Sequence, residues 1–416
     1  MIERRRVVVT GMGVVAPNGI GIENFWDSLV HGRSGVRKIT QFDASSYPCK
    51  VAAEVPNFNP TDYMDIKTAK RLGRFAQFAL AASKMAVEDA RLDVSKENSH
   101  KMGVFIGTAI GGGDIIETQT AIFYEKGLGR LSPYGSVSIC THLASGAISL
   151  KFNLKGPNTT IASGCNSGLD ATYLAYNAIR LSDADVMFAG AGEAPITPCT
   201  FALFCAGPGF LSRRNGNPTE ALRPYDKERD GTVLGEGGAI VVLEELGHAL
   251  ERKAHIYGEI LGYASGNESY DLFEVDPTGE AASIVMEKAL ENAHLKPEEI
   301  DYINSHGNGA GNYDLNETKA IKRTFGERAY RIPISSIKPV TGQSFSTTGI
   351  LQLITCMLTL NKGIIPPTIN IQSPDPLCDL DYTPNHFREK RVRNALMNAH
   401  GFGGGHTVLV IGKYDE

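Results

Sequence analysis

One stretch, residues 156–181, constrains the fold of this chain more than any other. The β-branched run TTI at residues 159–161 predicts a short strand, and the apolar spacing of residues 169–179 predicts a helix. Between them, the small residues ASG at 162–164 predict a tight turn that leads directly to Cys165. The sequence therefore predicts strand, turn and helix, with a thiol at the bend.

The position of Cys165 suits a nucleophile. A helix N-terminus favours negative charge, so it can lower the pKa of a thiol there below the free value of about 8.5. The small neighbours leave room for an acyl group, and backbone N–H groups of such a turn can stabilise the oxyanion of a tetrahedral intermediate. A cysteine in a tight turn can equally be a buried structural side chain. These residues alone leave both interpretations open.

Composition excludes several classes of protein. The 416 residues, 42% of them hydrophobic, suffice for two packed domains or one large core. A formal net charge of −5 argues against nucleic-acid binding, and no apolar run reaches the roughly 18 residues of a membrane span. Seven cysteines without a Cys-x-x-Cys pair predict neither a disulfide framework nor a zinc site. Together with the lack of a signal-peptide core, this favours the reducing cytoplasm.

The rest of the chain alternates strands and helices. Strands are expected at residues 6–15, 101–107, 184–190, 239–243, 257–265, 300–305 and 334–338, and helices at 22–32, 69–90, 279–293 and 349–360. A hairpin is expected at 393–398 and 407–412, and a long irregular segment, usually a functional feature, runs from 191 to about 237. The glycines at 111–113 lack the spacing of a phosphate-binding loop. We infer two similar α/β halves, 1–250 with Cys165 and 251–416.

Several motifs resemble one family in order and spacing. They are SGCNSGLDA around Cys165, NSHGNGAGNYD around His306, SSIKPVTGQ around Lys338 and GFGG at 401–404. This set is similar to the β-ketoacyl-acyl carrier protein synthases. The resemblance extends over essentially the whole chain through two further motifs, RPYDKERDGTVLGEGG and PPT…PDPLCDLDY. The motif sequences are most similar to those of type II polyketide ketosynthase subunits and ketosynthase II. The resemblance implies a thiolase-like five-layer αβαβα fold and a homodimer, or a heterodimer with a homologous subunit.

The resemblance also implies a reaction. Cys165 accepts an acyl chain from the phosphopantetheine of acyl carrier protein, and the acylated enzyme then condenses with malonyl-acyl carrier protein as CO₂ is lost. No permanently bound cofactor and no metal are expected. Two histidines of this family donate hydrogen bonds to the enolate oxygen. His306 matches the first, whereas Gln343 stands where the second is expected, in GQSFSTTG.

The meaning of Gln343 depends on what the missing histidine does. If it donates a hydrogen bond, the glutamine amide supplies a similar donor. If it moves a proton, glutamine cannot replace it, and the loss costs about 10²–10⁴-fold in rate. Two alternatives to condensation remain: acyl transfer without decarboxylation, and a scaffold or chain-length subunit with a retired pocket. Cys165 argues against the second, because such subunits usually lack the nucleophile.

Four further residues match positions that contact substrate in the family. Asn308 and Ala310 replace two threonines whose hydroxyls would contact the pantetheine amides, and Ala310 has no polar group to do so. Ile110 matches the floor of the acyl pocket. Phe402 matches a gating phenylalanine whose N–H joins that of Cys165 in the oxyanion hole.

Supporting residues are expected around His306. Asp314 and Glu317 match family acids, and Glu317 is expected to pair with Lys338 and orient the site; the pair can also be a plain surface feature. His400 replaces the usual Phe or Ser before GFGG, so it is either an imidazole offered to the site or an ordinary core or surface histidine.

Basic side chains suggest where an acidic carrier protein docks. A local positive patch on an acidic enzyme would steer such a partner at modest salt concentration, although charged faces are common on any surface. The candidates are Lys67, Lys70, Arg71, Arg213 and Arg214.

Overall fold

The computed structural model describes residues 5–207 and 209–415. The N-terminal part of the chain contributes five strands that lie in the spatial order β1 (Val7–Ala16), β8 (Gly237–Glu245), β7 (Val186–Glu193), β5 (Met102–Gly107) and β6 (Asn158–Ile161). The C-terminal part contributes five strands in the order β9 (Gly258–Asn267), β15 (Gly405–Gly412), β14 (Asn394–Gly401), β10 (Tyr302–Asn304) and β11 (Ile334–Ser335).

The two sets of strands have the same pairing pattern. Starting from β6 or from β11, two parallel pairs are followed by two antiparallel pairs. The sets join where β1 pairs with β9, through Val8 opposite Glu259 and Val9 opposite Gly258. Strands β1, β7 and β8 of the first set are buried on both faces, β1 over its whole length, so they read as continuous apolar runs rather than as alternating ones, whereas the edge strand β6 is only partly buried.

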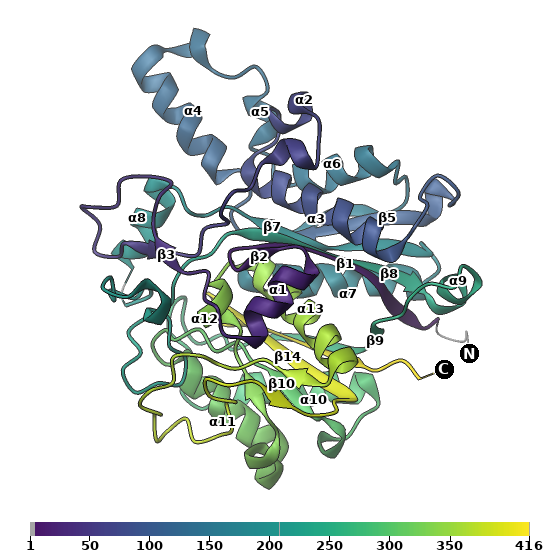
Figure 1. Cartoon of the computed structure of the whole chain (residues 1–416), viewed down its shortest axis with the longest axis vertical. Helices are drawn as coiled ribbons and strands as arrows, with labels where there is room; N and C mark the ends of the chain where they lie inside the picture. The colour runs from purple at the N-terminus through teal and green to yellow at the C-terminus, as the bar shows by residue number, and fades with distance from the viewer. Residues whose placement is uncertain (1–4, 208, 416) are drawn as a thin grey trace.

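Helices separate and cover the strands to give five layers (Figure 1). The outer layer of the N-terminal half holds α3 (Arg74–Ala90) and α6 (Leu143–Phe152), and that of the C-terminal half holds α10 (Glu280–Ala293) and α11 (Tyr313–Phe325). The middle layer holds α7 (Ser167–Arg180) and α13 (Ser346–Lys362). The architecture is therefore αβαβα, as expected from the resemblance.

The N-termini of the two middle helices approach each other very closely. A Cβ atom on Gly168 would lie 2.3 Å from the Ser346 carbonyl oxygen, and one on Gly349 would lie 2.8 Å from Leu169 Cγ. Glycine is required at both positions, because no side chain fits between the helices. This contact places the turn before α7 beside the turn before α13, which carry Cys165 and Gln343.

Shorter elements connect these layers. They are β2 (Gly19–Ile20), α1 (Ile22–Val30), β3 (Arg37–Lys38), β4 (Val51–Ala52), α2 (Ile66–Ala69), α4 (Gly113–Lys126), α5 (Gly135–Ser138), α8 (Pro198–Ala206), α9 (Leu246–Glu251), α12 (Lys338–Thr341), β12 (Ile364–Ile365) and β13 (Arg388–Glu389). In the described part of the chain, no helix combines the length and apolar character needed to cross a membrane.

Some expected boundaries were wrong. The helix expected at 69–90 begins only at Arg74, because Gly73 has an extended backbone and separates it from α2. The segment from 191 to 237 is not irregular throughout, since it contains α8. The strand expected at 334–338 ends at Ser335, and Lys338 instead begins α12.

Candidate active site

Cys165 lies in a single 3₁₀ turn, Gly164–Asn166, between β6 and α7. Gly164 has φ = +65°, a conformation that favours glycine, and Ser167 Oγ braces the turn by accepting from Ser163 N at 2.8 Å and donating to Gly164 O at 2.7 Å. The arrangement of strand, turn and helix predicted from the sequence is confirmed. The thiol is 6% exposed.

Burial decides the ionisation of Cys165. Loss of hydration raises the pKa of the Cys165 thiol to about 11, although the Lys338 charge and the Gln343 hydrogen bond both lower it. The expected shift of this group toward the thiolate is therefore not found, because burial has the larger effect on its pKa. The resting nucleophile is a protonated thiol, and its proton must leave as the acyl group arrives.

Gln343 contacts the nucleophile directly. Its Nε2 donates to Cys165 Sγ at 3.3 Å, and its side chain is 1% exposed. The backbone at this position is fixed on both sides, because Gln343 N donates to Val233 O and Gly235 N donates to Gln343 O, at 2.8 and 2.9 Å. The amide thus occupies a defined position beside the sulfur.

His306 follows β10 and is a neutral imidazole. Burial and the nearby Lys338 charge hold its pKa well below the usual range. The backbone N–H of His400 donates to His306 Nδ1 at 3.1 Å, so the ring proton must be on Nε2. The side-chain amide of Asn308 lies 3.1 Å from this Nε2. Asn308 therefore contacts the catalytic imidazole.

Lys338 lies at the start of α12 and contacts both the backbone and the ring of His306. Its Nζ donates to the His306 carbonyl oxygen and lies 3.4 Å from His306 Nδ1. Burial lowers the pKa of Lys338 to about 8, so the amine is largely protonated at neutral pH. Its charge disfavours a second positive charge on the imidazole and favours a negative one on the thiol.

Glu317 and Asp314 hold the loop that carries His306. Glu317 accepts from the backbone N–H groups of His306 and Gly307 at 2.7 and 2.9 Å, and Asp314 accepts from those of Asn308 and Gly309 at 3.1 and 3.2 Å. Both acids are buried rather than on a surface. The expected pairing of Glu317 with Lys338 is not a direct salt bridge in the described residues, but the Glu317 charge acts on Lys338 and raises its pKa against the effect of burial.

His400 reaches the site through its backbone. Its side chain is 4% exposed, and its ring centroid lies 3.9 Å from that of His406 and 5.9 Å from that of His306. The His400 side chain is therefore a buried core histidine rather than an imidazole offered to the site.

Two cavities meet at Phe402. One, of about 570 Å³, is lined by Cys165, and the other, of about 460 Å³, by Ala310; both are also lined by Ile110, Phe204 and Phe402. The Phe402 ring is partly exposed and packs 4.7 Å from Phe210. This position between the cavities suits the expected gate. The placement of Ile110 and Ala310 suits contact with an acyl-pantetheine chain.

The chain next to Phe402 lies close to the nucleophile. A Cβ atom on Gly401 would lie 3.6 Å from the Cys165 backbone nitrogen. The shared oxyanion hole of Cys165 and Phe402 stays a prediction.

The expected docking residues fall into two groups. Lys67, Lys70 and Arg71 lie on or just after α2, and the Arg71 guanidinium stacks on Tyr134. Arg213 and Arg214 follow Phe210, which lines the second cavity. The first group thus belongs to the segment around α2, and the second to the segment after α8.

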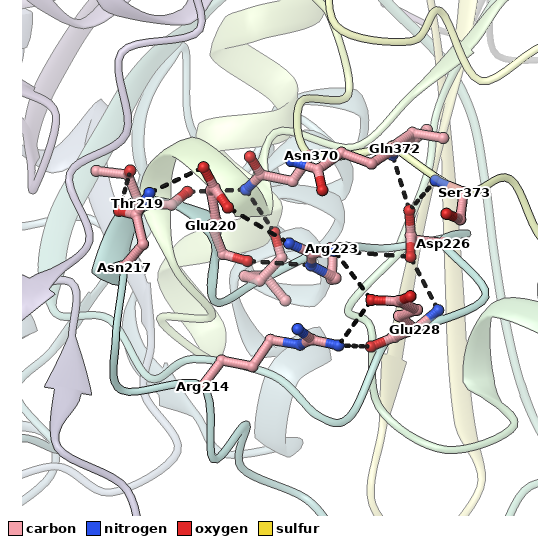
Figure 2. Close-up of polar contacts among 12 residues, drawn as sticks. Arg214, Asn217, Thr219, Glu220, Arg223, Asp226, Glu228, Asn370, Gln372 and Ser373 are labelled. Atoms are coloured by element: carbon pink, nitrogen blue, oxygen red, sulfur yellow. Dashed lines mark hydrogen bonds and ion pairs between the residues drawn. The ribbon is translucent and has the colours of Figure 1, made fainter.

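Arg214 belongs to a polar network and is not a free charge. Figure 2 shows it directed at Glu228, 3.4 Å away, and it also lies 3.6 Å from Asp230. In the same network Asp226 accepts from the backbone of Gln372 and Ser373 at 2.8 and 2.7 Å. The network ties the segment after α8 to the loop before β13, which makes Arg213 the better docking candidate of the two.

One buried acid of the site was missed from sequence. Glu193 ends β7 and accepts from Ile110 N at 3.4 Å, Thr108 Oγ1 at 3.1 Å and Ser346 Oγ at 2.7 Å. Burial raises the pKa of Glu193 to about 7. Its signal was a lone acid at the end of an apolar strand, in MFAGAGEAP.

A buried cysteine that lines a cavity, a neutral histidine and a buried lysine whose charge acts on both define a cysteine-dependent acyltransferase of the thiolase fold. Comparison with known proteins makes this specific. The family descriptions "Beta-ketoacyl synthase, N-terminal domain" and "Beta-ketoacyl synthase, C-terminal domain" match residues 4–249 and 257–372. The chain belongs to the β-ketoacyl synthase family.

Relatives cover the whole chain. The 3-oxoacyl-[acyl-carrier-protein] synthase 2 of Coxiella burnetii is 41% identical over 412 residues, 99% of either chain, and that of Synechocystis is 41% identical over 413 residues, also 99% of either chain. One similar solved structure is a type II PKS acyl-carrier protein in complex with its ketosynthase bound to the hexaketide. Its TM-score is 0.92 at 36% identity, and the match covers 99% of this chain and 100% of that chain. The ishigamide ketosynthase/chain length factor has a TM-score of 0.93 at 32% identity, with the same coverage.

Proposed function

We propose that this protein is a ketosynthase that extends an acyl chain carried by acyl carrier protein, in fatty-acid or polyketide biosynthesis. One observation carries the proposal: a side-chain amide donor, Gln343 Nε2, lies 3.3 Å from the buried sulfur of Cys165, and the Lys338 charge acts on both this thiol and the neutral imidazole of His306. The group carried by the partner is a thioester on its phosphopantetheine arm, and the chain itself contributes the nucleophile and the hydrogen-bond donors.

The first step is acyl transfer. The Cys165 thiol loses its proton, and its sulfur attacks the thioester carbonyl. The bond from that carbonyl to the phosphopantetheine sulfur then breaks, and the released thiolate takes up the proton. The Lys338 charge and the Gln343 donor stabilise the cysteine thiolate against the cost of its burial. The product is an acyl-Cys165 thioester and a free carrier arm.

The second step makes the new carbon–carbon bond. The malonyl group loses CO₂, which leaves an enolate with its charge on the thioester oxygen. Donors already directed at that oxygen stabilise it without reorganisation of water, and His306 Nε2–H and Gln343 Nε2–H are the two available groups. The enolate carbon attacks the acyl-Cys165 carbonyl, the bond to the sulfur breaks, and the 3-oxoacyl chain remains on the carrier.

A second candidate is acyl transfer without decarboxylation. The observation that favours it is the engagement of one donor: the Gln343 amide already donates to Cys165 Sγ. If this contact persists when malonyl groups bind, only His306 Nε2–H remains for the enolate. The enzyme would then move acyl groups between carriers.

Intact-mass analysis separates the two candidates. Acyl-carrier protein should add one acyl mass to the wild-type chain and none to Cys165→Ala, whereas Cys199→Ala, which removes an exposed thiol, should be acylated like the wild type. Acylation of the Cys165→Ala chain would refute the assignment of the nucleophile. Loss of CO₂ from malonyl-carrier protein supports condensation, and its absence supports transfer alone.

The partners follow from the same proposal. The proposed dimer would use the sheet edge at β6, which pairs with β5 on one side and with no other strand of the described residues. Exposed apolar side chains lie on the helices that flank this strand, among them Leu150 on α6 and Leu181 at the end of α7. The second subunit is an identical chain or a homologue. All seven cysteines lie in the described residues and are free thiols, which fits the proposed cytoplasmic location.

A further inference from the structure

Three metal-ligating side chains that the condensation does not use meet beside the active site. They are Glu268, just after β9, His400 near the end of β14, and His406 in β15. Their potential ligand atoms all lie within 4.8 Å of one another. Both imidazoles and the carboxylate are more than nine-tenths buried.

His400 supplies an independent sign that a ligand belongs here. Its Nε2 is buried and has no hydrogen-bond partner in the described part of the chain, and it lies 3.9 Å from Glu268 Oε1. A buried polar atom without a partner is destabilising, so such atoms in proteins are usually bonded to a water molecule, an ion or another group. A small cavity of about 10 Å³, lined by His400 and His406, adjoins the cluster, and this is room for about one water molecule.

We propose that Glu268, His400 and His406 bind one zinc ion, with a water molecule as the fourth ligand. Two imidazoles and one carboxylate are a zinc ligand set, and bonds of about 2.0–2.2 Å in a tetrahedron place neighbouring ligand atoms about 3.3 Å apart. The His406 and His400 Nε2 atoms lie 2.7 and 3.9 Å from Glu268 Oε1, on either side of that separation. Small side-chain rotations therefore suffice to complete the site.

The carboxylate is already oriented for this role. Asp276 N donates to Glu268 Oε2 at 2.8 Å, and Asn316 Nδ2 donates to Oε1 at 3.0 Å. Hydrogen bonds of this kind fix the orientation of the side chains that bind a metal, and their loss typically lowers metal affinity about 10–100-fold. Glu268 is distant in sequence from the two histidines and the set includes no cysteine, so Cys spacing could not indicate this site.

The position of the site gives it a consequence for the gate. His400 and His406 are directly opposite each other in the β14–β15 pairing, at the base of the loop that carries Phe402. Glu268 N also donates to Gly404 O in this loop at 2.9 Å. Zinc would join β9, β14 and β15 at this base and restrain the loop, and hence Phe402, between the two cavities.

Zinc binding to the full-length, tag-free chain tests the proposal. After treatment with a chelator, the protein is dialysed against ZnCl₂ and its zinc content measured by mass spectrometry, together with amide exchange of the 401–405 loop. We expect one more zinc per chain in the wild type than in His400→Ala, slower exchange in the loop when zinc is bound, and a zinc affinity at least about 100-fold lower in His400→Ala. His100→Ala, which removes an exposed imidazole, should bind like the wild type.

Two additions keep the test decisive. Glu268→Gln preserves the shape of the side chain, so it should bind zinc weakly while keeping the wild-type melting temperature in chelator. Cobalt(II) should give the visible bands of a tetrahedral site without the near-ultraviolet bands of thiolate ligands, which excludes binding by cysteines. Equal zinc content in the wild type, His400→Ala and Glu268→Gln, or thiolate bands in the cobalt spectrum, would overturn the proposal.

Discussion

Replacing Gln343 by alanine should separate the two steps of the reaction. The amide is a buried neutral donor 3.3 Å from Cys165 Sγ, and a hydrogen bond to a charged acceptor contributes about 1.5–3 kcal/mol. Loss of this bond to the thiolate should slow acylation by about 10- to 100-fold. Loss of an enolate donor in a water-free pocket should slow decarboxylation more, by about 10²–10³-fold. Gln343→His, which restores a ring N–H donor, should keep or raise decarboxylation.

The assay follows CO₂ release from malonyl-carrier protein and, separately, the appearance of acyl-Cys165 by intact mass. Gln77→Ala is a suitable control, because Gln77 is also a partly buried amide, donates to Ala69 O and Leu72 O, and lies on the outer helix α3. Melting temperatures show whether each variant is folded. If Gln343→Ala releases CO₂ as fast as the wild type, the amide is not an enolate donor. If the wild type releases none while Gln343→His does, the wild type transfers acyl groups without condensation.

Three other outcomes follow from the geometry. Because the pKa of Cys165 is raised to about 11, only about one thiol in 10³ is ionised at pH 8. The acylation rate should therefore rise nearly tenfold per pH unit below pH 8, and less steeply above it, where Lys338 (pKa about 8) loses its charge. A rate independent of pH in stopped-flow acylation would contradict the assigned pKa. Arg213→Glu should raise KM for the carrier protein several-fold and weaken the salt dependence of KM. Arg214→Gln removes a charge that is already paired with acids, so it should change KM less. Equal effects of the two variants would place the docking site elsewhere. Sedimentation should give twice the 44.8 kDa chain mass, and a folded monomer at micromolar concentration would refute the dimer.

The local features of the sequence were sufficient to place the nucleophile. The TTI run, the small residues and the following helical spacing predicted the strand, turn and helix around Cys165, and the structure has them. These predictions succeeded because each depends on backbone preferences over a few neighbouring residues. The ordered set of motifs then predicted the layers of the fold.

Properties that depend on burial could not be predicted in this way. The helix N-terminus suggested a low pKa for Cys165, but the residues that cover the thiol come from distant segments, and the resulting loss of hydration outweighs the local effect. In the same way, charge alone suggested a partner for Lys338, whereas Glu317 is engaged by the backbone N–H groups of the His306 loop. Glu268, His400 and His406 come together only through strand pairing.

The formation of a carbon–carbon bond tests the central claim most directly. The enzyme is incubated with acyl-carrier protein and carbon-13-labelled malonyl-carrier protein, and the products on the carrier are identified by mass spectrometry. We predict a 3-oxoacyl chain longer by two labelled carbons, with release of CO₂ and with no product from Cys165→Ala. A labelled malonyl group that stays intact while Cys165 becomes acylated would contradict the claim and identify the protein as a transacylase.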